Sequence, residues 1–157
     1  MNNHEASSDS AIWVDADACP GAIKEILFKA AARTHISLTL VANHFMRIPK
    51  AHNVQLLQVE RGFDVADNTI LDRVNSGDFV VTSDIPLADE LVDKNVVVIT
   101  PRGELLTAEN IKPKLNIRDF METLRASGQN TSGPPPLSNS DKQSFANALD
   151  KWLAKNA

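Results

Sequence analysis

Five short apolar runs, separated by stretches with helical periodicity, constrain the fold of this chain more than any other feature. They lie at residues 12–14, 37–42, 54–59, 79–82 and 96–99. Helices are expected between them, at 22–33, at 64–76 and from Pro86 onward. Strands that alternate with helices imply right-handed βαβ crossovers. We therefore expect an α/β fold of three layers, α/β/α, with a mostly parallel five-stranded sheet.

The composition of the 157 residues fits a single globular domain. The amino-terminal residues are polar and lack a secretion-signal pattern, and no apolar run is long enough to cross a membrane. The single cysteine, Cys19, excludes an internal disulfide and suits the reducing cytoplasm. The formal net charge of -4 argues against a general nucleic-acid coat protein. It does not argue against a nuclease, whose carboxylates lower the net charge.

The carboxyl third of the chain changes character. Helical pieces are expected at 107–115 and 118–126, before a segment rich in Pro, Ser and Gly. Ser140 matches the start of a capping box. The helix that follows has one apolar face, formed by Phe145, Leu149, Trp152 and Leu153. This face must dock on the body of the chain or on a partner, such as a second copy in a homodimer. The expected organisation is a disordered tail at 1–10, an α/β domain at 11–127, a linker at 128–139 and a docking helix at 140–157.

Aspartates recur where an expected strand ends and the next helix begins. They are, in chain order, Asp15, Asp17, Asp64, Asp67, Asp84 and Asp89. Because the carboxyl ends of parallel strands meet at one edge of a sheet, this acidic set is expected to gather there. Acidic residues also favour the amino ends of helices as caps, so any single member could be purely structural.

Carboxylates that gather at one edge repel one another unless they bind a cation, share a proton or move apart. Two carboxylates about 4 Å apart repel by roughly 4 kcal/mol at an effective dielectric constant of about 20. Oxygen ligands without supporting cysteine or histidine favour Mg²⁺ or Mn²⁺ over zinc. Such ions generate the hydroxide nucleophile and neutralise the leaving oxygen in phosphodiester cleavage. The expected metal ligands are Asp15, Asp17, Asp67, Asp84 and Asp89.

Polar and basic residues near the strand ends are the candidates for substrate binding. They are Asn43, Arg47, Lys50, Thr82, Ser83 and Arg102. The basic side chains could contact phosphates, and the loop at 43–53 is where a substrate strand would be gripped. The two hydroxyl residues could hydrogen-bond a phosphate or cap the next helix. Cys19 has no histidine near it in sequence, which disfavours a nucleophilic role.

Seven stretches, in order along the chain, together carry a specific resemblance. They are Val14-Asp15-Ala16-Asp17-Ala18-Cys19-Pro20, Val41-Ala42-Asn43, Gly62-Phe63-Asp64-Val65-Ala66-Asp67, Thr82-Ser83-Asp84-Ile85-Pro86-Leu87-Ala88, Pro101-Arg102-Gly103-Glu104, Arg118-Asp119-Phe120-Met121 and Phe145-Ala146-Asn147-Ala148-Leu149-Asp150. They resemble motifs of the bacterial YaiI/YqxD family over residues 12–153. The family often has Thr-Gly-Gly-Pro where this chain has Thr131-Ser132-Gly133-Pro134, a departure that affects only the linker.

The resemblance implies a PIN-like fold, the architecture of many metal-dependent ribonucleases, in a family that is largely uncharacterised. Carried over to this chain, Asp15 looks like the acid of the first strand in PIN domains, and Asp84 like the acid after the fourth strand. Asp64 or Asp67 would supply the middle acid, which makes these four the expected catalytic residues. Two further acids are similar in placement, Asp17 and Asp89.

Three functions remain open. The first is a divalent-metal-dependent nuclease, with single-stranded RNA favoured as its substrate. The second is a non-catalytic module that binds RNA or a protein in a PIN-like pocket. The third is a Mg²⁺-dependent phosphatase of the haloacid-dehalogenase type, with Asp15 and Asp17 as nucleophile and acid/base. Cys19 and Pro20 replace the small or hydroxyl residues expected after such a D-x-D motif, which counts against the phosphatase.

Overall fold

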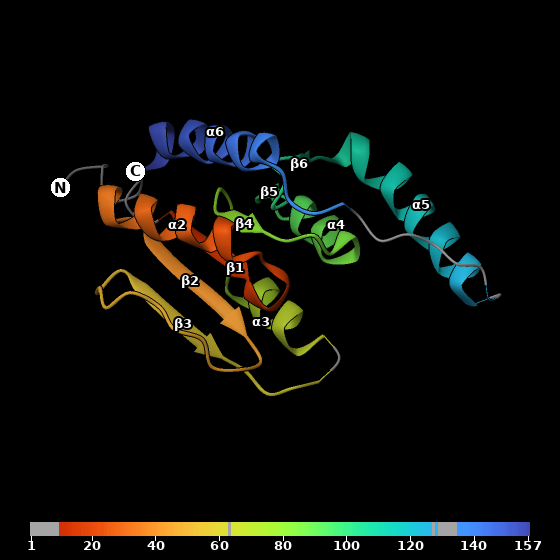
Figure 1. Cartoon of the computed structure of the whole chain (residues 1–157), viewed down its shortest axis with the longest axis horizontal. Coiled ribbons are helices and arrows are strands. Elements are labelled where there is room, and N and C mark those ends of the chain that lie inside the picture. Colours follow the sequence, from red (N-terminus) through yellow and green to blue (C-terminus); the bar gives the residue numbers. More distant parts are fainter. Residues whose placement is uncertain (1–9, 63, 127, 129–134) are drawn as a thin grey trace.

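The computed structural model describes residues 10–62, 64–126, 128 and 135–157, and its central feature is a six-stranded sheet in the order β3-β2-β1-β4-β5-β6 (Figure 1). The strands are β1 (Ala11–Asp15), β2 (Ser37–Ala42), β3 (Val54–Gln58), β4 (Phe79–Val81), β5 (Val97–Ile99) and β6 (Leu105–Leu106). All pairings among β1 to β5 are parallel, whereas β6 pairs antiparallel with β5. The mostly parallel sheet is confirmed. The sequence predicted five strands and the sheet has six. The missed strand, β6, has only two residues, too few to form an apolar run.

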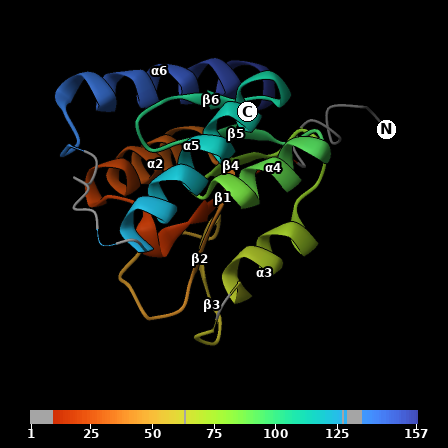
Figure 2. The ribbon, with the colours of Figure 1, turned by 90° about the vertical axis from the view of Figure 1, so that its right-hand side faces the viewer.

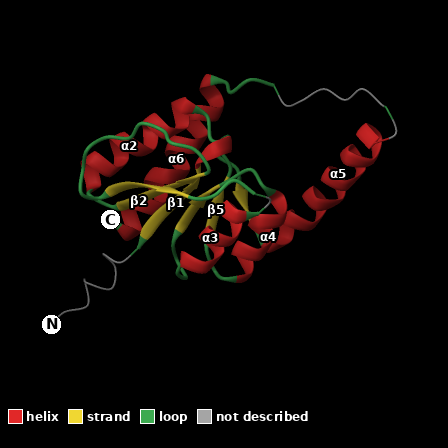
Figure 3. Ribbon diagram, turned by 90° about the horizontal axis from the view of Figure 1, so that it is seen from below, coloured by secondary structure: helices red, strands yellow, loops and turns green. Residues whose placement is uncertain are grey.

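Helices cover both faces of this sheet. They are α2 (Gly21–Thr34), α3 (Val65–Arg73), α4 (Ile85–Asp93), α5 (Ala108–Ala126) and α6 (Asn139–Asn156), with a 3-10 turn η1 (Ala16–Ala18) after β1. In Figure 2, α6 lies along α2, while α3 and α4 lie across the sheet from them. Figure 3 shows the three layers from below, with α5 extending beyond α4. The α/β/α arrangement expected from the sequence is therefore confirmed.

Alternation along the strands explains the layers. In β1, Ile12 and Val14 join the apolar cluster under α2 and α6, and Trp13 joins the cluster under α3 and α4. Because both faces are covered, each residue of the strand meets apolar neighbours, as in parallel sheets generally. The apolar runs in the sequence are continuous because both faces of the strands are buried.

The strand order reverses between β1 and β4. The chain leaves β1 toward β2 and β3 on one side, and then crosses back to place β4 on the other side. α2 and α3 lie on opposite faces of the sheet (Figure 3), as right-handed crossovers in opposite directions require. A crevice forms at such a switch point, outside the carboxyl ends of the two strands, and ligands bind there in open α/β sheets.

The terminal helix α6 docks on the sheet of the same chain. Its buried side chains are Phe145, Leu149, Trp152 and Leu153, the four that the sequence places on one face. The Phe79 ring of β4 lies 5.3 Å from the Trp152 ring, centroid to centroid, and 6.4 Å from that of Phe145. The Trp152 indole Nε1 donates a hydrogen bond of 3.1 Å to the carbonyl of Gly77. α6 therefore completes the core under α2.

Three expected helix boundaries were wrong. The helix predicted at 64–76 ends at Arg73, because Val74 turns to extended backbone. The pieces predicted at 107–115 and 118–126 form the single helix α5, which continues through Pro113 at the loss of one backbone hydrogen bond. The capping box begins at Ser138 and not at Ser140: the Ser138 hydroxyl accepts from the Asp141 N–H, and the Asp141 carboxylate accepts from the Ser138 N–H, both at 3.0 Å.

Asp78 is a structural acid that the sequence did not reveal. It is 1% exposed and lies just before β4, at the amino edge of the sheet. Its carboxylate accepts hydrogen bonds from the backbone N–H groups of Ala11 and Asn75 and from the indole of Trp13. The bonds from Ala11 and Trp13 tie β1 to the residue before β4, at the edge opposite the acidic set, and the bond from Asn75 closes the turn that leads into β4.

Two expectations concern segments that the structure leaves undescribed. The tail predicted at 1–10 falls outside the described residues except for Ser10, and so does the stretch 129–134 of the predicted linker. In the described part of the chain, no helix combines the length and apolar character needed to span a membrane.

Removal of the Trp152 side chain should destabilise the fold. We expect Trp152→Ala to lower the free energy of unfolding by about 3–5 kcal/mol, because a large buried aromatic leaves a cavity. Urea denaturation measures this, with the exposed neighbour Lys151→Ala as the control. Equal stability of the two variants would mean that α6 contributes nothing to the core in solution.

Candidate functional site

Three carboxylates meet at the switch point, and we call Asp15, Asp67 and Asp84 the carboxylate trio. Asp15 is the last residue of β1, and Asp67 lies in the first turn of α3. Asp84 is the N-cap of α4, where its Oδ1 accepts a 3.0 Å hydrogen bond from the Leu87 N–H. A strand end and two helix starts thus position the three side chains, as the sequence pattern predicted for the carboxyl edge of the sheet.

Thr82 holds two members of the trio in place. Its hydroxyl donates to Asp15 Oδ2 at 2.9 Å and accepts from the Asp84 backbone N–H at 3.0 Å. Thr82 is 2% exposed, so its hydroxyl is engaged inside the protein. The sequence offered Thr82 as a substrate contact or a cap; in the structure it is a positioning residue for Asp15 and Asp84. Ser83, the next residue, is exposed.

The charges of the trio act on one another. Burial raises the pKa of Asp67 to about 7, and the negative charges of Asp84 and Asp15 add to this effect. A hydrogen bond between the Asp67 and Asp84 carboxyl groups raises it further. Burial also raises the pKa of Asp15; the Thr82 hydrogen bond opposes this shift, and the charges of Asp84 and Asp17 add to it. The site therefore retains a proton at a pH where an ordinary aspartate has none.

The donor set of the trio suits a hard divalent cation, since it consists of carboxylate oxygens alone. Within the described residues, however, no three His, Cys, Asp or Glu side chains are already spaced as ligands of one ion. Protonation of Asp67, whose pKa is raised to about 7 by burial and by the charges of Asp84 and Asp15, would relieve the same repulsion that a cation would relieve. The residues thus match Mg²⁺ or Mn²⁺ in the chemistry of their donor atoms and not in their present spacing.

The structure separates the two candidates for the middle acid. Asp67 joins the trio, whereas Asp64 is exposed at the N-cap of α3, and its charge is the smallest influence on the pKa of Asp67. Asp64 adopts a left-handed backbone conformation with φ of 65°, which non-glycine residues rarely adopt. Asp89 lies within α4, five residues after the N-cap Asp84, and the structure gives it no contact with the trio among the described hydrogen bonds and ion pairs.

Asp17 is tied to the loop after β2. Its Oδ2 accepts from the Asn43 backbone N–H at 2.9 Å, and its Oδ1 lies 2.8 Å from His44 Nδ1. These contacts anchor the start of the loop 43–53 beside the trio. The structure thus gives Asp17 a positioning role, next to the predicted role as a metal ligand. Asn43 contributes its backbone to this contact, and Arg47 and Lys50 lie further along the same loop, both exposed.

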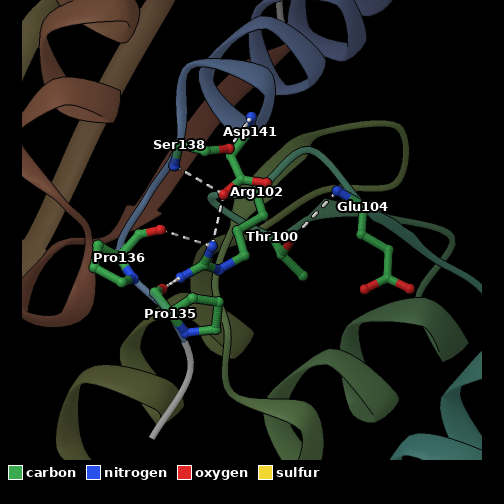
Figure 4. A network of polar contacts seen from close by, with 7 residues as sticks. All are labelled: Thr100, Arg102, Glu104, Pro135, Pro136, Ser138 and Asp141. Carbon is green, nitrogen blue, oxygen red and sulfur yellow. Dashed lines mark hydrogen bonds and ion pairs between the residues drawn. The ribbon is translucent and has the colours of Figure 1, made fainter.

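Arg102 has internal partners, in contrast to the phosphate contact expected from the sequence. Figure 4 shows its guanidinium between Asp141 and the carbonyls of Pro135 and Pro136. Nη1 lies 2.6 Å from the Asp141 carboxylate, which also closes the capping box with Ser138. Arg102 therefore fastens the segment before α6 to the turn after β5.

Cys19 is not a nucleophile in this arrangement. It is 7% exposed, and burial raises the pKa of its thiol to about 12. The neighbouring Lys24 ammonium opposes this shift, and the Asp15 charge adds to it. The thiol thus stays protonated at neutral pH.

The raised pKa of Asp67 predicts a pH-dependent stability in the absence of metal. The unfolded chain loses this proton near the ordinary value of 3.8, whereas the folded chain keeps it until about 7. The stabilising contribution is therefore complete below pH 3.8 and is lost as the pH rises through 7. Asp67→Asn, which mimics the protonated form, should exceed the parent in stability at about pH 8 by on the order of 1 kcal/mol, a figure discounted for solvent screening of this partly exposed group.

Urea denaturation in EDTA at about pH 5 and about pH 8 measures this difference. The control is Asp72→Asn, an exposed acid on the same helix. A parent and an Asp67→Asn variant with the same pH dependence would show that Asp67 does not carry the retained proton.

Comparisons with known proteins identify the family. A family model described as "Uncharacterized BCR, YaiI/YqxD family" matches residues 13–155. A UPF0178 protein of Shewanella amazonensis is 60% identical over 144 residues, which cover 92% of this chain and 97% of that protein. A UPF0178 protein of Colwellia psychrerythraea is 62% identical over 144 residues, covering 92% and 95%, respectively. One of Hydrogenovibrio crunogenus is 58% identical over 146 residues, covering 93% and 97%.

No solved structure matches the chain significantly. The family model and the curated relatives each span nearly the whole chain, and they confirm the resemblance found in the motifs around Asp15, Asp67 and Asp84. The chain belongs to the YaiI/YqxD family of uncharacterised proteins.

Proposed function

We propose that this protein is a divalent-metal-dependent nuclease that hydrolyses phosphodiester bonds in RNA. The observation that carries the proposal is the convergence of Asp15, Asp67 and Asp84 at the switch point of the sheet, where α/β proteins bind their ligands. Three interacting carboxylates are an unfavourable arrangement for the fold alone, so a function that needs them explains their presence better than capping does.

The trio would hold the ion. Mg²⁺ or Mn²⁺ bound there would supply an activated water and neutralise charge on the leaving oxygen. Thr82 fixes the orientation of Asp15 and the backbone of Asp84, so two of the ligands are positioned before any ion binds. Asp67 approaches from α3 on a separate element and completes the set.

RNA is the favoured substrate because the loop 43–53, which begins beside the acidic edge at Asn43, carries basic side chains along its length. Arg47 and Lys50 are exposed there, in a chain whose net charge is -4. Basic groups on a loop that leads away from a carboxylate cluster suit a substrate with a phosphate backbone, which needs cations along its length and a metal at the scissile bond.

The contacts of Asp17 disfavour the alternative function, a phosphatase of the haloacid-dehalogenase type. In that mechanism the second acid of the D-x-D motif must face the reacting group beside Asp15. Here both carboxylate oxygens of Asp17 have partners in the loop, the Asn43 N–H and the His44 ring. These contacts count against Asp17 as the acid/base of the phosphatase.

Cleavage of single-stranded RNA tests the proposal. We expect Mn²⁺ or Mg²⁺ to support cleavage and EDTA to abolish it. Asp15→Asn and Asp84→Asn should each lower the rate by more than about 100-fold, because each keeps the side-chain shape but removes a ligand charge. The matched control is Asp72→Asn, an exposed acid outside the trio.

Three outcomes separate the functions. Binding of RNA without cleavage under either metal would contradict the nuclease and leave a binding module. Preference for small phosphate esters, with activity lost through Asp17→Asn as much as through Asp15→Asn, would indicate the phosphatase. Undiminished RNA cleavage by the Asp15→Asn, Asp84→Asn double variant would show that the trio is not the active site.

A further inference from the structure

A groove of about 780 Å³ lies between the loop 43–53 and the edge strand β3. The loop runs from the carboxyl end of β2 back to the amino end of β3, on the face of the sheet that α2 covers further in. The side chains used below are Phe45, Arg47, Lys50, Leu56 and Gln58, all of which line the groove.

The loop alternates between half-buried and exposed side chains. Met46 and Ile48 pack against the apolar cluster under α2. Phe45 and Arg47, at the intervening positions, are exposed, and Phe45 is 72% exposed. The inward residues fix the loop on the core, so the aromatic ring and the guanidinium are presented to solvent from an anchored backbone.

The charges of the groove have one sign. Its lining contains Arg47 and Lys50 but no Asp or Glu. Among the described residues, neither cation takes part in an ion pair. Lys24 adds a third cation at the α2 side, with its Nζ 3.7 Å from the sulfur of Met46. This local positive charge lies in a chain of net charge -4.

We propose that the groove binds single-stranded nucleic acid, with a base stacked on Phe45 and phosphates held by Arg47 and Lys50. An exposed aromatic between unpaired cations is the combination that single strands require, since every base has a face to stack and every nucleotide carries a charge. Gln58, on the same side of β3 as Leu56, offers an amide to a base edge.

The groove leads to the carboxylate trio. The residues just before Phe45 are bonded to Asp17, through the Asn43 N–H and the His44 ring. Asp17 lies two residues after Asp15, in the 3-10 turn η1 that follows β1. A strand in the groove therefore reaches the acidic edge at the Phe45 end. In this respect the inference rests on the proposed nuclease, for which it identifies the substrate path.

Fluorescence anisotropy with a labelled oligouridylate of about 12 nucleotides tests the groove. The measurement is made in EDTA, so that binding is scored without cleavage. We expect Phe45→Ala to weaken binding by about 10-fold or more and Phe45→Trp to retain it. Arg47→Ala and Lys50→Ala should each weaken binding most at low salt and reduce the salt slope by about 1.

The control is Ile117→Ala, which truncates another exposed apolar side chain, 63% exposed, on α5. Oligothymidylate of the same length shows whether the sugar matters; tight binding of either polymer, lost in Phe45→Ala, supports the groove. Parent-like binding by Phe45→Ala and Arg47→Ala would overturn it. So would a change in molecular mass of Phe45→Ala with unchanged RNA binding, which would identify an interface between copies.

Failure of the groove and failure of the nuclease are distinguishable. If oligouridylate binds through Phe45 and no metal supports cleavage, the groove stands and the nuclease falls. If the parent and Phe45→Ala bind and cleave RNA equally, while Asp15→Asn does not cleave it, the nuclease stands and the groove falls.

Discussion

The parallel pairing of β1 with β4 is the interaction on which the rest of this structure depends. It aligns Val14 with Val81, so Asp15 at the end of one strand comes level with Thr82 at the end of the other. The Thr82 hydroxyl then joins Asp15 to the backbone of Asp84. At the opposite edge, buried Asp78 ties the starts of the same two strands. Without this register, the switch point and the carboxylate trio would not exist.

In the trio, partial burial makes the negative charges of neighbouring carboxylates unfavourable. Its carboxyl groups lie partly within the fold, where repulsion is strong, and burial together with the charges of Asp84 and Asp15 raises the pKa of Asp67 to about 7. A bound divalent cation would also neutralise this repulsion, with two positive charges where a proton supplies one. The stable elements around the trio, a strand end and two helix starts, keep the carboxylates together in either case. This arrangement is typical of sites where function takes precedence over stability.

The sequence predicted the features that depend on local patterns. Apolar runs predicted the five parallel strands, helical spacing predicted the buried face of α6, and helix starts predicted the edge where Asp15 and Asp84 gather. It could not choose between Asp67 and Asp64, because the choice follows from a left-handed turn at Asp64. The sequence also suggested that Arg102 binds a substrate. Its ion pair with Asp141 was not predictable, because the two residues lie far apart in the chain. Long-range polar contacts leave no periodic signal.

Anomalous scattering from a crystal grown with Mn²⁺ shows whether the carboxylate trio binds a divalent cation. We expect one strong peak at the switch point, with oxygens of Asp15, Asp67 and Asp84 at about 2.1 Å. The Asp84→Asn variant should show a weaker peak or none. A saturating Mn²⁺ concentration that leaves the trio empty, or that places the ion at other carboxylates, would contradict a metal site at the trio.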